Sequence, residues 1–203
     1  MYFYVLNNNA PVITLNGSAV VYIEARTGVD YIEQGAVVTD DIDGDITNSL
    51  VISGYVNEEV KGTYYIKYDA KDSHGNNAIS VYRQVVVRDT TAPIVTLIGN
   101  KEIKLLYGQQ YIEYGATAVD NYDGELEVII NNPIIEDKIG TYSVTYVAYD
   151  ESGNRGSTIR YVEVIDNVSP VITLIGDEIT YVEVYTEFED EGALIEDNVD
   201  GTF

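Results

Sequence analysis

Alternating apolar and polar positions are the dominant pattern of this chain. Large apolar or aromatic side chains occupy every second position in residues 63–70, and the same alternation returns in residues 141–148. A period of two is typical of a strand with one buried face. Residues 81–87 and 160–165 are rich in β-branched and aromatic side chains, which also favour strands. Because apolar residues nowhere recur at helical spacing over three turns, the pattern predicts an all-β protein.

Four sequence blocks recur in a fixed order. The first reads APVITL at 10–15, APIVTL at 92–97 and SPVITL at 169–174. The second reads YIEQGA at 31–36, YIEYGA at 111–116 and FEDEGA at 188–193. An acidic loop follows each of these, DDIDGD at 40–45, DNYDGE at 120–125 and DNVDGT at 197–202. The fourth block, GTYYIKY at 62–68, returns once, as GTYSVTY at 140–146. These blocks predict a tandem array with a period of about 80 residues.

Short strands between regular turns predict the architecture of each repeat. Turn-forming pairs such as Asp43-Gly44, Ser53-Gly54 and Gly153-Asn154 separate the predicted strands. Repeats of this size and pattern are typical of immunoglobulin-like Greek-key β-sandwiches with about seven strands each. A single large β-barrel is the alternative, and the repetition argues against it.

The blocks also divide the chain into expected domains. Residues 10–89 form the first repeat, residues 90–166 the second, and residues 167–203 a partial third. Residues 1–9 are interpreted as the last strand of a preceding repeat plus a linker, because YFYVL at 2–6 corresponds to RQVVV at 83–87. On this reading the chain is truncated at both ends and belongs to a longer array.

Composition narrows the classes of partner. Asp and Glu number 34 against 11 Lys and Arg, which gives a formal net charge of −23. Nucleic acids and anionic lipids are therefore disfavoured partners, and self-repulsion favours a monomer within a longer chain. No apolar run approaches the ~20 residues of a spanning helix, so direct membrane insertion of this segment is not expected. The absence of Cys excludes a disulfide framework.

The blocks resemble the bacterial immunoglobulin-like repeats of surface proteins and pesticidal crystal proteins, which are related to hyalin-repeat modules. That family's pattern has an Asp before the first strand, a G-A-x-x-x-D-x-x-D-G loop, a G-T-Y strand and D-x-x-G-N before the last strand. Here these are Asp89, residues 115–124, residues 140–142 and residues 150–154. The first repeat departs from the pattern at its start, where residues 7–9 are Asn. The resemblance implies a sandwich fold and an extracellular location, on a cell or virion surface or in a secreted protein.

The G-T-Y strand also resembles the tyrosine corner of immunoglobulin domains. Tyr64 and Tyr142 stand two residues before Ile66 and Val144, which occupy the position of the second Cys in antibody domains. The hydroxyl of each Tyr is expected to bond back to the chain a few residues upstream.

The acidic loops are candidate calcium sites. In an antiparallel sandwich the segment entering the first strand, the loop after Gly-Ala and the D-x-x-G-N loop share one pole, so their carboxylates should converge. Ca²⁺ takes six to eight oxygen ligands in flexible geometry and would offset the mutual repulsion. The candidate ligands are Asp40, Asp41, Asp43, Asp45, Asp72, Asp89, Asp120, Asp123, Glu125, Asp150, Asp166, Asp197 and Asp200. Because Asp, Asn and Gly also favour turns, solvated turns without an ion remain the alternative.

Catalysis has little support in the sequence. His74 is the single histidine, and it lies in a turn where the second repeat has Ser152. With no Cys and no second His, a thiol nucleophile and a zinc site are both excluded. Paired carboxylates such as Asp41 and Asp43 could mimic a glycosidase pair, but they lie in a turn that recurs three times with changing residues, whereas an active site is expected once per chain. The chain is therefore not expected to be an enzyme.

Three functions remain open. The first is a structural or adhesion module in an extended surface stalk, with calcium between domains. The second is a recognition module that binds a glycan or protein receptor through its loops or an exposed strand edge. The third is an accessory spacer or targeting segment of a larger enzyme or toxin.

Overall fold

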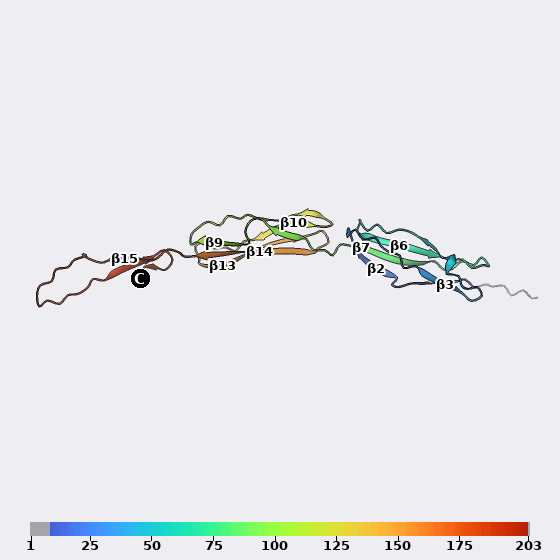
Figure 1. Ribbon diagram of the computed structural model, residues 1–203, viewed down its shortest axis with the longest axis horizontal. Helices are drawn as coiled ribbons and strands as arrows, with labels where there is room; N and C mark the ends of the chain where they lie inside the picture. The colour runs from blue at the N-terminus through green and yellow to red at the C-terminus, as the bar shows by residue number, and fades with distance from the viewer. Residues whose placement is uncertain (1–8, 203) are drawn as a thin grey trace, which may run out of the picture. The chain divides into compact units, whose positions relative to one another are not determined.

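The computed structural model describes residues 9–202, so the strand expected at residues 2–6 lies outside the described part. The first repeat is a sandwich of two sheets (Figure 1). A three-stranded sheet has the order β1-β3-β4, with β1 (Val12–Leu15), β3 (Ala36–Asp40) and β4 (Gly44–Asp45). A four-stranded sheet has the order β2-β7-β6-β5, with β2 (Val20–Glu24), β5 (Val51–Ser53), β6 (Gly62–Asp69) and β7 (Val81–Arg88). A short 3₁₀ helix, η1 (Thr47–Ser49), lies between β4 and β5.

The second repeat has the same strand order. One sheet is β11-β10-β8, with β8 (Ile94–Leu97), β10 (Ala116–Asp120) and β11 (Gly124–Leu126). The other is β12-β13-β14-β9, with β9 (Glu102–Leu106), β12 (Ile129–Asn131), β13 (Gly140–Tyr149) and β14 (Arg155–Ile165). The prediction of an all-β, immunoglobulin-like fold with seven strands per repeat is confirmed.

One pair of strands in each of the first two repeats runs parallel. β2 pairs in parallel with β7, from Val20 opposite Gln84 to Glu24 opposite Arg88. β9 pairs with β14 in the same way. Parallel strands need a long crossover connection, and here nearly the whole repeat provides it.

The alternation read from the sequence matches the burial of the side chains. In β6, Ile66 and Tyr68 are buried while Tyr65 is exposed. Together with Ala70 they pack against Ile13, Ala36 and Val38 from the facing sheet, and this cluster is the core of the first repeat. The equivalent positions of the second repeat are Val144 and Tyr146, which pack with Leu105, Tyr111, Val162 and Val164.

The third segment forms one sheet within the described residues. Its order is β15-β16-β17, with β15 (Val171–Leu174), β16 (Ala193–Asp197) and β17 (Gly201–Thr202). Nearly all of its side chains are exposed, because residues 167–202 include no counterpart of the four-stranded sheet that covers this face in the first two repeats.

The chain divides into two compact units. The first contains the residues up to Pro93 together with Val119–Leu126 and Tyr149–Arg155, and the second contains the rest. The acidic loop and the D-x-x-G-N loop of the second repeat therefore belong to the same unit as Asp89.

Both predicted tyrosine corners are present. The hydroxyl of Tyr64 donates to the carbonyl oxygen of Val60 at 2.9 Å, and that of Tyr142 donates to Lys138 O at the same distance. Each bond runs back four residues and fixes the turn before the long central strand, as expected.

Each repeat also buries an arginine that the sequence analysis did not single out. Arg160 is fully buried, and all of its nitrogens donate hydrogen bonds. Nη1 donates to Glu113 Oε1 at 3.0 Å, to Tyr146 Oη at 2.8 Å and to Tyr111 Oη at 3.1 Å. Nε donates to Asn100 O at 2.9 Å, and Nη2 donates to the carbonyl oxygen of Ile98. The guanidinium thus ties the Y-I-E block to the last strand.

The first repeat holds its arginine less completely. Nη2 of Arg83 donates to Asn16 O at 2.6 Å and to Gly35 O at 3.2 Å. Nη1 lies 3.5 Å from Glu33 Oε1, and neither Nη1 nor Nε has a hydrogen-bond partner among the described residues. Both arginines therefore bond to the Y-I-E block and the preceding turn, but all three nitrogens of Arg160 donate hydrogen bonds, whereas within residues 9–202 only Nη2 of Arg83 does.

Candidate metal centre

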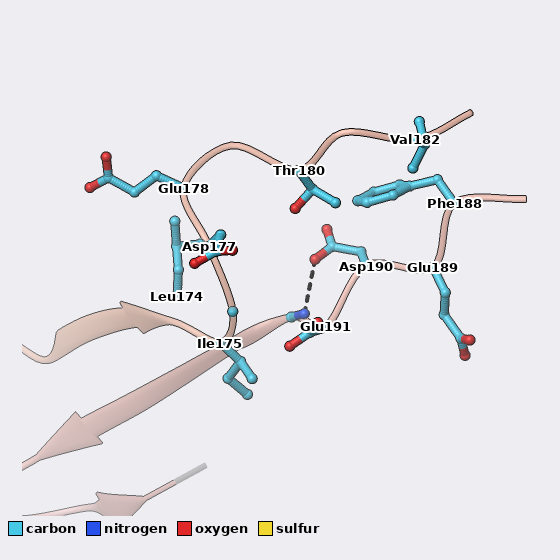
Figure 2. A pocket seen from close by; sticks show the side chains of 12 residues that line it. Leu174, Ile175, Asp177, Glu178, Thr180, Val182, Phe188, Glu189, Asp190 and Glu191 are labelled. Carbon is cyan, nitrogen blue, oxygen red and sulfur yellow. Dashed lines mark hydrogen bonds between the residues drawn. The ribbon is translucent and has the colours of Figure 1, made fainter. Parts of the chain in front are cut away.

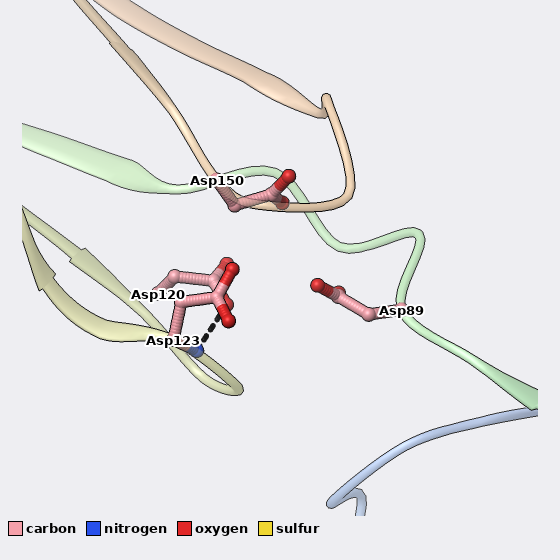
Figure 3. A group of neighbouring side chains, drawn as sticks. All are labelled: Asp89, Asp120, Asp123 and Asp150. Atoms are coloured by element: carbon pink, nitrogen blue, oxygen red, sulfur yellow. Dashed lines mark hydrogen bonds between the residues drawn. The ribbon is translucent and has the colours of Figure 1, made fainter. Parts of the chain in front are cut away.

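Four aspartates of the first unit bring their carboxylates together. Asp89 follows β7, Asp120 ends β10, Asp123 lies in the turn between β10 and β11, and Asp150 follows β13. One oxygen from each lies within 4.8 Å of the others, and Figure 3 shows the side chains facing a common point. Among the described residues, this is the group that could hold a metal ion.

Asp120 is the most buried residue of the four, with 4% of the residue exposed. Its Oδ1 accepts hydrogen bonds from the backbone N–H of Tyr122 at 2.7 Å and of Asp123 at 3.1 Å. These bonds shape the turn, and Gly124 supports it by adopting a positive φ of 79°. Oδ2 is buried and has no hydrogen-bond partner among the described residues. Since such an oxygen is costly to leave unpaired, it is available to accept a further hydrogen bond or to bind a cation.

The loop of residues 150–154 donates hydrogen bonds to the other three carboxylates. Asp150 Oδ1 accepts from the N–H of Asn154 and Oδ2 from its side-chain amide, both at 2.7 Å. Asp123 Oδ2 accepts from the N–H of Glu151 at 2.8 Å. Asp89 Oδ2 accepts from the hydroxyl of Ser152 at 2.9 Å. This one loop therefore positions all three carboxylates.

The charges of this group are only partly offset. Two carboxylates within 4.8 Å repel each other by about 3 kcal/mol at an effective dielectric constant of about 20. Burial raises the pKa of Asp89 above its ordinary value, and the negative charges of Asp120 and Asp150 act in the same direction. Lys61 contributes one positive charge, with Nζ 3.9 Å from Asp89 Oδ2 and 3.8 Å from Asp123 Oδ1. One ammonium does not balance four carboxylates.

The donor set fits a hard divalent cation. All four side chains offer oxygen, which calcium and magnesium prefer, whereas zinc and copper favour nitrogen and sulfur ligands. Calcium suits the site better, because it accepts six to eight oxygens in flexible geometry and backbone carbonyls and water can complete its shell.

The corresponding loop of the first repeat folds in the same way, but within residues 9–202 its carboxylates form no such group. Asp40 accepts from the backbone N–H of Ile42 and Asp43, as Asp120 does in the second repeat. The N–H and hydroxyl of Ser73 both donate to Asp43 and hold its pKa below the ordinary value. Asp72 accepts from the N–H of Asn76 at 2.7 Å.

The remaining predicted ligands lie apart from the four-carboxylate group. Asp41 accepts from the side-chain amide of Asn9 at 2.6 Å, and Asp45 accepts from the N–H of Thr47 at 3.0 Å. Glu125 is exposed on β11, beyond the turn that holds Asp120 and Asp123.

In the third segment, the predicted ligands serve the local turns. Asp166 accepts from the N–H of Val168 at 2.9 Å. Asp197 accepts from the N–H of Val199 at 2.8 Å and of Asp200 at 3.0 Å. Asp200 itself is exposed.

Comparison with known families decides the identity of the repeats. Residues 13–87 and 95–164 match the family of bacterial surface protein Ig-like domains. The chain belongs to this family. Among curated relatives, an uncharacterised 81.3 kDa protein of Acholeplasma phage L2 is 30% identical over 162 residues, which is 75% of this chain and 22% of that protein. The serine-rich adhesin for platelets of Staphylococcus aureus is 26% identical over 204 residues, which is 87% of this chain and 14% of the adhesin in strain MRSA252.

The chain of this bacterial surface Ig-like protein thus spans less than a quarter of the length of these relatives. Among solved structures, a lipoprotein of Bacteroides thetaiotaomicron matches 75% of the chain and 78% of its own length, with 19% identity and a TM-score of 0.35. In the described residues there is no helix with the length and apolar character of a membrane span.

The third segment of this Ig-like chain contains a shallow hollow. Figure 2 shows it between residues 174–182 and 188–192, with Asp190 accepting from the N–H of Gly192 at 2.9 Å. Leu174, which lines it, is 61% exposed, whereas its counterparts Leu15 and Leu97 are partly buried against the cores of their repeats. Of the lining residues only Leu174 lies on a strand, so the hollow is formed mainly by the exposed connection between β15 and β16.

Sequence reasoning missed Lys61 as a neighbour of the carboxylates. The second repeat has Ile139 at the equivalent position, immediately before its G-T-Y strand. Because the lysine is not part of the repeated pattern, the repeat gave no signal for it.

Proposed function

We propose that this chain is a non-catalytic structural and adhesion module, a segment of an extended stalk of Ig-like repeats on a cell or virion surface, in which Ca²⁺ binds Asp89, Asp120, Asp123 and Asp150. The observation that carries the calcium site is the buried Oδ2 of Asp120, which lies in the four-carboxylate group without a hydrogen-bond partner among the described residues. Family membership and relatives named as adhesins support the surface role.

Calcium would act on the linker between the two matched segments. Asp89 lies in that linker, and the other three carboxylates come from two loops of the second repeat. A shared ion would hold the linker residue against both loops and remove the repulsion among the carboxylates. We expect a dissociation constant of about 10⁻⁴ to 10⁻³ M, the range typical of extracellular modules, where calcium is abundant.

The test is a thermal melt of the full chain in EDTA, in millimolar Ca²⁺ and in millimolar Mg²⁺. A ligand at 100 times its dissociation constant stabilises a fold by about 2.7 kcal/mol, which raises the midpoint by several degrees. We expect a calcium-specific rise that Asp120→Asn and Asp123→Asn abolish. Asp40→Asn is the matched control, because Asp40 makes the same turn bonds in a loop without the four-carboxylate group. An equal rise with Mg²⁺, or none with Ca²⁺, would leave these loops as solvated turns.

Direct recognition of a glycan or protein receptor is the second candidate function, favoured by the naming of relatives as adhesins. Beads coated with the chain should then be retained on particular members of an array of glycans and matrix proteins. Uniform lack of retention would leave the chain as a spacer, whether in a stalk or beside a larger enzyme or toxin.

A further inference from the structure

Lys61 places a positive charge at the edge of the carboxylate group. Its ammonium lies 3.8 Å from Asp123 Oδ1 and 3.9 Å from Asp89 Oδ2. These are ion-pair distances, but they are longer than the 2.7–2.9 Å of a charge-assisted hydrogen bond. The ammonium donates instead to the hydroxyl of Ser152 at 2.9 Å, which in turn donates to Asp89 Oδ2. The lysine therefore attracts two of the four carboxylates without saturating their oxygens.

The position of Lys61 is fixed by its surroundings. Its backbone N–H donates to Tyr122 Oη at 3.3 Å, and the preceding Val60 is the acceptor of the tyrosine corner. Its ammonium also lies 4.2 Å from the centre of the Tyr122 ring, a cation–π contact. The ring is a neutral partner, so the ammonium keeps one favourable contact even when it gives up the carboxylates.

We propose that Lys61 is a built-in counter-ion that competes with the divalent cation for Asp89 and Asp123 and thereby sets the affinity of the site. This inference rests on the proposed calcium site. In the metal-free chain the ammonium offsets part of the carboxylate charge. When the divalent cation binds, it and the Lys61 ammonium compete for the oxygens of Asp89 and Asp123. The ammonium must then withdraw toward Ser152 and Tyr122. The competition weakens binding, so that the site responds to calcium at extracellular and not at trace concentrations.

The group also contains a carboxylate oxygen that Lys61 leaves unpaired. Asp120 is only 4% exposed, and its Oδ2 points into the group without a hydrogen-bond partner among the described residues. The lysine does not approach this oxygen in any contact of the described residues, so the cation would meet a ligand that Lys61 cannot satisfy.

The experiment is calcium titration calorimetry on the full chain with Lys61→Met, Lys61→Arg and Lys104→Met. Lys104 is the matched control, because it is an exposed lysine that pairs with one carboxylate, Glu163, at 3.1 Å. We expect Lys61→Met to lower the calcium dissociation constant about three- to tenfold, as loss of a partly exposed charge pair allows. Lys61→Arg keeps the charge and should stay near the unsubstituted chain, as should Lys104→Met.

A second measurement separates this inference from the calcium site itself. In EDTA, Lys61→Met should melt at a lower temperature than the unsubstituted chain, because the carboxylates lose their counter-ion, and added calcium should reverse the order. If the unsubstituted chain binds calcium and Lys61→Met binds it equally or more weakly, the proposal of competition by Lys61 is wrong, whereas the proposed calcium site is supported. If neither chain binds calcium, both proposals fall. Binding by Lys61→Met alone would establish the competition in its strongest form.

Discussion

Replacing each buried arginine with Met should affect the two repeats unequally. Arg160 is fully buried, and its nitrogens all donate to acceptors, including Glu113. Arg160→Met removes these bonds and leaves three carbonyl oxygens, those of Ile98, Asn100 and Gly115, and the carboxylate of Glu113 without their cation. Breaking a buried pair by removing one partner costs about 3–5 kcal/mol, and we expect this loss in the second repeat.

Arg83→Met should cost less, although Arg83 is just as buried. Its lost bonds go to two backbone carbonyls, and its contact with Glu33 is a longer one of 3.5 Å. The substitution also removes two buried nitrogens, Nε and Nη1, that have no hydrogen-bond partner among the described residues. Since an unsatisfied buried donor is itself costly, we expect a net loss of about 1–2 kcal/mol in the first repeat.

Urea denaturation measures the difference, with hydrogen exchange assigning each transition to its repeat. At a slope of about 1–2 kcal/mol per molar urea, a difference of ~2 kcal/mol separates the two midpoint shifts by about 1–2 M. Equal shifts, or a larger one for Arg83→Met, would refute the idea that donor satisfaction determines what these arginines contribute.

Two further predictions concern the tyrosine corners and Glu113. Tyr64→Phe and Tyr142→Phe each remove one tyrosine-corner hydrogen bond of 2.9 Å. Each substitution should lower the unfolding free energy of its repeat by about 1 kcal/mol, measured by urea denaturation. No loss would mean that packing alone fixes the corner. Acid should destabilise the second repeat through Glu113. Burial disfavours the charged form of Glu113 and raises its pKa. Three effects outweigh burial and hold the pKa of Glu113 below its ordinary value: a hydrogen bond from Tyr146, a hydrogen bond from the N–H of Gly115, and the positive charge of Arg160. Its contribution is therefore complete above the ordinary Glu pKa and is lost as pH falls through the lowered value. Melting midpoints from pH 7 to about 3 should fall less steeply in Glu113→Gln, and parallel curves would contradict this.

Much of the fold follows from local sequence patterns. Alternation in residues 63–70 predicts which side of β6 is buried, and the G-T-Y block predicts the two tyrosine corners. Strand direction alone also predicts that Asp89, Asp120 and Asp150 share one end of a sandwich, and the structure places them together.

The interior charges depend on information that local patterns lack. Arg83 and Arg160 stand in phase with inward-facing valines, so their burial could have been read from the alternation. Apart from Tyr146, which is 14 positions from Arg160, their hydrogen-bond partners come from segments 45–67 positions away, and only the packing of both sheets brings them together. Glu125 shows the opposite case, because it belongs to the acidic block but follows Gly124 onto a strand that carries it away from the group.

The parallel pairing of β2 with β7 has a mechanical consequence for a repeat within a longer chain. The repeat is entered through the strand before β2 and left at the end of β7, and the two strands run side by side from Val20 to Glu24. Tension applied to the two ends would pull these strands in opposite directions along their axes. Their hydrogen bonds would then be loaded together in shear instead of opening one after another as in a zipper. The second repeat has the same geometry in β9 and β14, so each repeat has a built-in clamp against stretching.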